Sequence, residues 1–265
     1  MKWMFKTPRE MEYEKAIELA LLAGYDGVEI QLYDFPDGIR WKNHLINALY
    51  QSGMIATIHS PSGDINLSSS NRGIREESLR QIKETIYLAK ELGALSVTVH
   101  PGRLSSVREK KEQQILWMEE AFLSIIEFAE KEQVFIGFEN MEARAKETYI
   151  YLEHINQLLD KKQSDFSGIT LDFAHLYTVD PTLNLASLRY PIQNVHISQC
   201  VQGKPHFRLD AAEGQLSISS CLRALQQIGY DKTVVIEAKD NSSFEDAKRN
   251  LQLLQNGLFE NNRGK

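Results

Sequence analysis

Short apolar segments rich in Val, Ile and Phe recur along the chain, and longer segments with helical periodicity separate them. This alternation is typical of a parallel sheet whose strands are joined by crossover helices. The pattern predicts eight strands, at Trp3–Phe5, Gly27–Gln31, Ile55–His59, Ser96–His100, Phe135–Glu139, Gly168–Asp172, Asn194–Ile197 and Thr233–Glu237.

Six segments between these strands have apolar residues at three- and four-residue steps, which predicts amphipathic helices. Gly24, Gly53, Gly93 and Gly229 each follow a helical segment just before the next strand, as expected of helix C-caps. The connection between the sixth and seventh strands is the least regular. The predicted helices are Glu14–Leu22, Trp41–Gln51, Arg75–Leu92, Lys111–Lys131, Thr148–Leu159 and Ser219–Ile228.

Eight strand–helix units within 265 residues match the size of one (β/α)8 TIM barrel better than two domains. We therefore expect an α/β fold with a single domain over residues 1–265, in which residues 255–265 form a polar C-terminal tail. An open doubly wound sheet is the alternative. No Gly-x-Gly-x-x-Gly follows the first strand and the sequence has no phosphate-cradling Gly-Lys-Ser/Thr loop, so nothing in it supports a nucleotide cofactor.

The chain carries 30 basic and 36 acidic residues, a formal net charge of −6. Because Lys and Arg supply most of the non-specific affinity for nucleic acid, this charge makes a nucleic-acid partner unexpected. Apolar runs such as residues 20–23 fall far short of the roughly 20 residues that a transmembrane helix needs, so we expect no membrane partner. With only Cys200 and Cys221 and no signal-peptide pattern, we expect a cytoplasmic location. The oligomeric state is not indicated.

Chemically active side chains stand at the ends of the predicted strands, where a TIM barrel builds its active site. Glu139 and Glu237 each follow a buried apolar run, in which an unpaired carboxylate would cost several kcal/mol. A bound cation relieves that cost, and mixed imidazole and carboxylate ligands suit Zn, Mn, Co or Fe. The strand-end residues are His59, His100, Glu139, Asp172, His196 and Glu237, with His175 and His206 close behind.

Several charged residues after the strand ends are weaker candidates. Lys204 and Arg208 could hold a phosphate or carboxylate on a substrate, although solvated surface charge is their more ordinary role. Glu29 lies inside a strand, where it either points toward the pocket or braces a neighbouring cation, and we leave it outside the predicted site.

At these positions the chain resembles the xylose isomerase-like TIM barrel superfamily, which includes sugar isomerases and epimerases as well as the endonuclease IV group. The resemblance covers nearly the whole chain. It rests on His59-Ser60-Pro61, Asn66-Leu67, His100-Pro101-Gly102, Glu139-Asn140, Asp172-Phe173-Ala174-His175, Val195-His196-Ile197, His206 with Glu213-Gly214, and Glu237.

The resemblance implies a metal site formed by Glu139, Asp172, His196 and Glu237. In the endonuclease IV group, the counterparts of His59 and His100 bind a second ion, and those of His175 and His206 bind a third together with an aspartate. That aspartate falls near Lys204 here, and an ammonium cannot ligate a cation, so the sequence does not provide a complete third site by this pattern.

Three functions follow from these observations. The first is divalent-metal-dependent isomerisation or epimerisation of a small sugar, polyol or sugar phosphate. In this reaction Glu139 and Glu237 transfer a proton next to a metal-bound carbonyl, and His175 polarises that carbonyl or orients the substrate.

The alternative is an endonuclease IV-like phosphodiester hydrolase acting at abasic sites. His59 and His100 favour it, while the net charge disfavours it. A regulatory sugar-binding module without turnover is the third.

Overall fold

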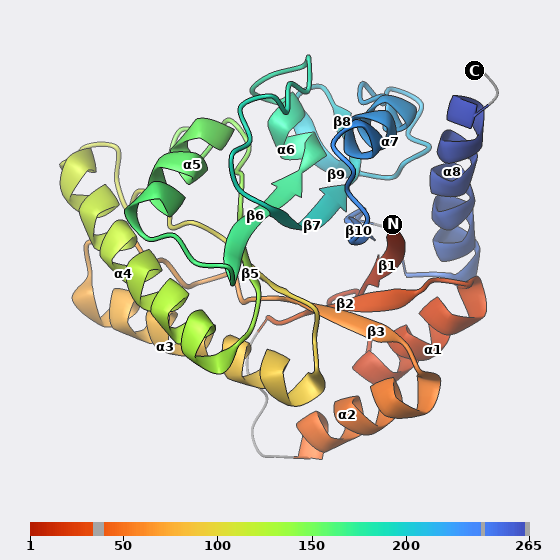
Figure 1. Cartoon of the computed structure of the whole chain (residues 1–265), viewed down its shortest axis with the longest axis horizontal. Helices are drawn as coiled ribbons and strands as arrows, with labels where there is room; N and C mark the ends of the chain where they lie inside the picture. The colour runs from red at the N-terminus through yellow and green to blue at the C-terminus, as the bar shows by residue number, and fades with distance from the viewer. Residues whose placement is uncertain (34–39, 240–241, 263–265) are drawn as a thin grey trace.

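The structure, a computed structural model, describes residues 1–33, 40–239 and 242–262. Eight parallel strands close into a barrel in the order β1-β10-β7-β6-β5-β4-β3-β2, and helices surround it (Figure 1). This confirms the predicted TIM barrel and excludes the open sheet. The barrel strands are β1 (Lys2–Lys6), β2 (Gly27–Gln31), β3 (Ile55–His59), β4 (Val97–Val99), β5 (Ile136–Glu139), β6 (Ser167–Asp172), β7 (Ile192–Ile197) and β10 (Thr233–Ile236).

The helices pack their apolar sides against the barrel wall, as their periodicity predicts. Gly24 and Gly93 end α1 and α3 in the left-handed conformation, with φ of 92° and 63°, as their C-cap positions indicated. The helices are α1 (Tyr13–Ala23), α2 (Arg40–Ser52), α3 (Arg72–Leu92), α4 (Lys111–Glu132), α5 (Leu152–Lys161), α6 (Phe173–Tyr177), α7 (Ile218–Gln227) and α8 (Phe244–Asn262).

The structure differs from the expected elements in three places. The irregular connection after β6 contains only the short α6, and a two-stranded hairpin of β8 (Gln199–Val201) and β9 (Lys204–Phe207) follows β7. Residues 255–262, expected in a polar tail, continue α8, which packs against α1 and α7; residues 263–265 of that tail lie outside the described residues. None of the helices in the described part of the chain combines the length and apolar character needed to cross a bilayer.

The interior of the barrel holds a layer of hydrogen-bonded polar side chains instead of aliphatic ones. Glu29 on β2 accepts hydrogen bonds from Thr57 on β3, at 3.2 Å, and from Asn194 on β7, at 2.7 Å. Thr98 and Thr170 pair at 3.1 Å, and Asn194 Nδ2 also lies 3.3 Å from Thr98 Oγ1. Because β2 and β7 are not neighbours in the sheet, these bonds cross the barrel interior. These hydrogen bonds link the barrel strands to one another below their carboxyl ends.

Candidate metal centre and active site

Four potential ligands converge at the carboxyl ends of adjacent barrel strands. Glu139 ends β5, Asp172 ends β6, His196 lies on β7, and Glu237 follows β10. One ligand atom from each residue lies within 4.8 Å of the others. The side chains of Glu139, Asp172 and His196 are buried, and that of Glu237 is 16% exposed. The strand order β5-β6-β7-β10 therefore brings together the four residues that the sequence singled out.

The His196 ring is held from both sides by carboxylates. Its Nδ1 atom lies 2.7 Å from Glu237 Oε2 and 3.0 Å from Glu139 Oε1. Its Nε2 atom lies 3.1 Å from Glu29 Oε1, at the opposite edge of the ring. A carboxylate on the far nitrogen fixes the orientation of a metal-binding histidine and raises its basicity. Glu29, which the sequence analysis left out, thus contacts the site directly.

Asp172 has one satisfied and one unsatisfied carboxylate oxygen. Its Oδ1 accepts a hydrogen bond of 2.7 Å from the backbone N–H of His175, so Asp172 is the N-cap of α6. Its Oδ2 is buried and has no hydrogen-bond partner within the described part of the chain. Asn140 fixes the Asp172 backbone through two hydrogen bonds, of 2.8 and 2.9 Å. Burial raises the pKa of this carboxyl, despite the opposing effect of His175. A cation would satisfy the unpaired lone pairs of the buried Oδ2.

The charges around Glu139 and Glu237 favour ionised carboxylates. Burial alone would raise the pKa of Glu139, but His100 and His196 outweigh burial and hold it well below its usual value. The same balance applies to Glu237, where Lys6 and His196 outweigh burial and lower the pKa. Conversely, burial would lower the pKa of His196, but the surrounding carboxylates of Glu29, Glu139 and Glu237 raise it well above its usual value. The four-residue group therefore contains ionised carboxylates at neutral pH.

His59 and His100 form a second group with Glu139. His100 Nε2 lies 2.7 Å from Glu139 Oε2, and His59 Nε2 lies 3.6 Å from the same oxygen. His59 donates a 2.8 Å hydrogen bond from Nδ1 to the carbonyl of Ser60, so its Nε2 faces Glu139. These three residues place their donor atoms within 4.8 Å of one another and could hold a cation.

A third group joins His175 and His206 to Glu142, a residue that the sequence analysis missed. His175 Nε2 lies 3.0 Å from Glu142 Oε2 and 3.1 Å from His206 Nε2. Burial would raise the pKa of Glu142, but His175 lowers it to about 2. Lys204, the residue that the resemblance places near this site, is exposed at the start of β9. Glu142 therefore provides a carboxylate beside these two histidines, and its position three residues after the end of β5 was the available signal.

Lys6 is the other site residue that sequence reasoning missed. It ends β1, and its ammonium forms an ion pair and hydrogen bond with Glu237 Oε1. Burial would lower its pKa, but the Glu237 and Glu29 carboxylates outweigh burial and raise it. A charged residue directly after the apolar run Trp3–Phe5, at the carboxyl end of the strand, was the signal that could have identified it.

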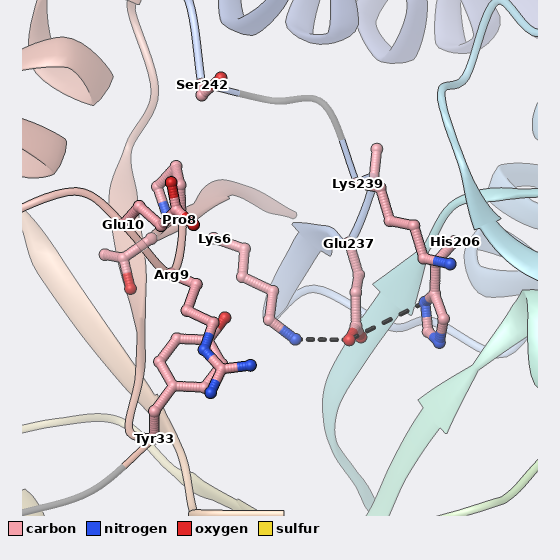
Figure 2. Close-up of a pocket in the computed structure, with 11 residues that line it drawn as sticks. Lys6, Pro8, Arg9, Glu10, Tyr33, His206, Glu237, Lys239 and Ser242 are labelled. Atoms are coloured by element: carbon pink, nitrogen blue, oxygen red, sulfur yellow. Dashed lines mark hydrogen bonds and ion pairs between the residues drawn. The ribbon is translucent and has the colours of Figure 1, made fainter. Parts of the chain in front are cut away.

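A pocket of about 450 Å³ opens beside Glu237 (Figure 2). Its wall comes from the segment after β1, from the segment after β10, and from Tyr33 and His206. Lys204 and Arg208, the two expected anion-binding residues, do not line it. Arg208 instead lies 3.1 Å from Asp210 and 3.2 Å from Asp246.

The chain matches the family model described as "Xylose isomerase-like TIM barrel" over residues 17–257. An uncharacterized protein of Methanocaldococcus jannaschii, MJ1311, is 29% identical over 76% of this chain and 69% of its own length. A D-tagatose 3-epimerase-like protein aligns over 100% of this chain and 99% of its own, with 23% identity and a TM-score of 0.86. D-psicose 3-epimerase from Clostridium cellulolyticum H10, solved with D-tagatose, aligns over 97% and 99% with 16% identity and a TM-score of 0.78. By its sequence and its barrel, the chain belongs to the xylose isomerase-like TIM barrel family.

Proposed function

We propose that this protein is a divalent-metal-dependent epimerase or isomerase acting on a small sugar, polyol or sugar phosphate. The observation that carries the proposal is the convergence of Glu139, Asp172, His196 and Glu237, with the unsatisfied Asp172 Oδ2 among them. The names of the solved epimerases described above support the same reaction class. A cytoplasmic location remains part of the proposal, with Cys200 and Cys221 free and buried.

The donor set fits a divalent cation. Three carboxylates and one imidazole, each buried or nearly so, match the ligand preference of Zn, Mn, Co or Fe. Such a cation would polarise the substrate carbonyl and stabilise the charge that develops on its oxygen. Glu139, Asp172, His196 and Glu237 are the residues that would hold it.

Glu139 and Glu237 are the proposed acid and base. Both flank His196 Nδ1 and both have lowered pKa values, so each can accept a proton from the carbon next to the carbonyl. Epimerisation needs one group to remove the proton and another to return it, and the pocket adjoins Glu237. Proton transfer at carbon therefore needs one of the two as the carboxylate that removes the proton and the other as the carboxylic acid that returns one, and the two roles exchange in the reverse reaction.

We assign His175 to organising the site. The sequence analysis gave it a role on the substrate carbonyl, but its Nδ1 donates a 2.8 Å hydrogen bond to the carbonyl of Asn140. Its Nε2 faces Glu142 and His206. Because neighbouring residues engage both nitrogens, His175 is suited to supporting those neighbours, and its predicted role in polarising the carbonyl or orienting the substrate stays a prediction.

One observation favours the hydrolytic alternative: two further groups of potential metal ligands lie near the first. They are His59, His100 and Glu139, and Glu142, His175 and His206. A multinuclear centre of this kind suits phosphodiester hydrolysis. The net charge of −6 opposes binding to nucleic acid. We therefore treat hydrolysis as a second candidate, which the experiment below distinguishes.

The test is hydrogen exchange at carbon. The metal-loaded protein is incubated with a panel of ketoses, ketose phosphates and aldoses in deuterated water, and deuterium on the reacting carbon is measured by mass spectrometry. Glu139→Gln and Glu237→Gln should each abolish exchange, because an amide cannot accept the proton. Glu132→Gln, which removes a carboxylate from a surface ion pair with Lys90, is the matched control and should exchange normally.

Two results would overturn the proposal. The first is an absence of exchange across the panel together with cleavage of an abasic-site duplex that His100→Ala abolishes, which would establish the hydrolytic function. The second is tight binding of a sugar by the metal-loaded protein with neither exchange nor cleavage, which would establish a binding module.

A further inference from the structure

Lys6 is the one lysine or arginine, among the described residues, that forms an ion pair with a carboxylate of the metal centre. The other ion-pair partners described for these carboxylates and for Glu29 are histidines. The side chain of Lys6 is only 14% exposed, and a buried ammonium is costly unless a partner compensates its charge. Lys6 therefore belongs to the charge balance of the site, although the proposed reaction gives it no task.

Lys6 reaches the site because of the way β1 pairs in the barrel. The register of β1 with β2 places Lys6 beside Glu29. On the other side of β1, Phe5 lies beside Ile236 of β10, and Glu237 follows Ile236 directly. Lys6 and Glu237 thus stand at the carboxyl ends of neighbouring strands. Figure 2 shows the Lys6 ammonium pointing at the Glu237 carboxylate.

The two oxygens of Glu237 face different partners. Oε1 accepts a hydrogen bond from Lys6 and lies 3.9 Å from His206 Nδ1. Oε2 lies 2.7 Å from His196 Nδ1, beside a member of the four-residue group, and accepts no hydrogen bond from the described residues. A carboxylate can bind a cation through one oxygen or through both. Because Lys6 occupies Oε1, Oε2 is the oxygen left for an ion.

We propose that Lys6 is a positioning residue that makes Glu237 a metal ligand through one oxygen only. The inference rests on the proposed function and deepens it by giving Lys6 a role at the same site. With Oε1 engaged by the ammonium, the coordination position that a second carboxylate oxygen would fill stays open for a substrate oxygen. A carboxylate oxygen has two lone pairs, so Oε1 can accept from Lys6 and still take a proton in the proposed reaction.

The charge of Lys6 sets the direction of the expected effect. An ammonium and a divalent cation compete for the same carboxylate and repel each other, so Lys6 weakens metal binding while it orders the ligand. Loss of Lys6 should therefore tighten metal binding, whereas loss of a negatively charged partner such as Glu29 should weaken it. A side chain that only filled space at the end of β1 would leave the affinity unchanged or, through a less stable fold, lower it.

The first experiment measures Co²⁺ binding by Lys6→Met, which removes the charge and the donor and keeps an unbranched side chain. On protein stripped of metal, competition with a chelator should show Co²⁺ bound at least about tenfold more tightly than by the wild type. The visible absorption of the bound Co²⁺ should become weaker, because its intensity falls when a further oxygen binds. Lys2→Met is the matched control, since Lys2 lies at the other end of β1, 3.9 Å from Asp26, and its loss should change neither quantity.

The second experiment uses Glu237→Gln to test which oxygen Lys6 holds. An ammonium can bond only to the oxygen of the amide, so Lys6 should turn the NH₂ group toward the ion and strongly reduce metal affinity. When Lys6→Met is combined with Glu237→Gln, the amide can turn its oxygen to the ion, and at least about tenfold of the lost affinity should return. The combined variant contains neither buried charge, so it keeps the inference testable even where Lys6→Met alone does not fold.

The outcomes that overturn the role of Lys6 are distinct. Unchanged or weaker Co²⁺ binding by folded Lys6→Met overturns it, as does an absence of recovery in the combined variant. An equal gain from Lys6→Met in the wild-type and Glu237→Gln backgrounds would mean that Lys6 acts through its charge alone, which overturns positioning.

Other outcomes separate this inference from the proposed function. Wild-type protein that binds no divalent ion refutes the proposed function, and the role of Lys6 with it. Metal binding that responds to Lys6→Met and to the combined variant as expected, without exchange of any sugar in deuterated water, leaves the role of Lys6 standing and refutes the epimerase.

Discussion

The contact between Glu29 and His196 leads to a quantitative prediction for metal affinity. Glu29 Oε1 lies 3.1 Å from His196 Nε2, while the Nδ1 atom of the same ring faces Glu139 and Glu237. Glu29→Gln keeps the size of the side chain and its acceptor for Thr57, but it removes the charge that makes the ring a stronger ligand.

Loss of such a partner lowers metal affinity by about 10- to 100-fold in metal sites of this kind. At 1.4 kcal/mol per factor of ten, this corresponds to roughly 1.4–2.8 kcal/mol of binding free energy. Because Glu29 is fully buried and contacts His196 directly, we expect the loss of binding free energy to lie in the upper half of that range. The effect should appear in the dissociation constant, with the number of bound ions unchanged.

The assay is a competition titration with a chelator of known affinity, on protein first stripped of metal. Thr98→Val serves as the control, because Thr98 belongs to the same polar layer and bonds to Thr170 without contacting His196. Both variants are checked for a cooperative thermal transition. Glu29→Gln protein with wild-type affinity, or Thr98→Val protein that weakens binding equally, would refute the argument that Glu29 tunes His196.

Three further predictions concern ion number, packing and pH. Glu142→Gln should reduce the ions bound per chain at saturating Zn²⁺ while Lys204→Asp leaves that number unchanged, as elemental analysis can measure. Gly137→Ala should lower the free energy of unfolding in urea by about 1–3 kcal/mol. An added Cβ would lie 2.3 Å from an atom of β6, whereas at Gly63 it would meet nothing within 4 Å, so Gly63→Ala is the control. The raised pKa of His196 means that a metal must displace a proton, so chelator titrations between about pH 6 and pH 8 should show affinity increasing with pH.

The barrel could be predicted because each of its strands and most of its helices can be recognised from a short stretch of sequence. Each strand has its own apolar run, and a helix with its own periodicity follows most strands. The site candidates were equally accessible where they end a strand, as Glu139 and Asp172 do, since the barrel topology brings all carboxyl ends of the strands to one face.

The remaining site residues depend on pairings that periodicity does not encode. Glu29 meets His196 across the interior of the barrel, from a strand that is not its neighbour. Glu142 lies in a loop whose path determines whether its carboxylate reaches His175. Lys6 acquires its role only when β1 pairs with β10 and places it beside Glu237. These contacts join distant parts of the sequence, and one sequence contains no record of them.

The positions of the four ligands connect metal binding to the closure of the barrel. Glu139, Asp172 and His196 belong to three consecutive strands, while Glu237 follows β10, the strand that seals the sheet against β1. An ion held by all four binds only the closed form, so it stabilises closure against opening by about 2.7 kcal/mol at one hundred times its dissociation constant. Metal supply would then affect the stability of the folded chain as well as its chemistry, because removal of the ion would lower the free energy of unfolding by this amount.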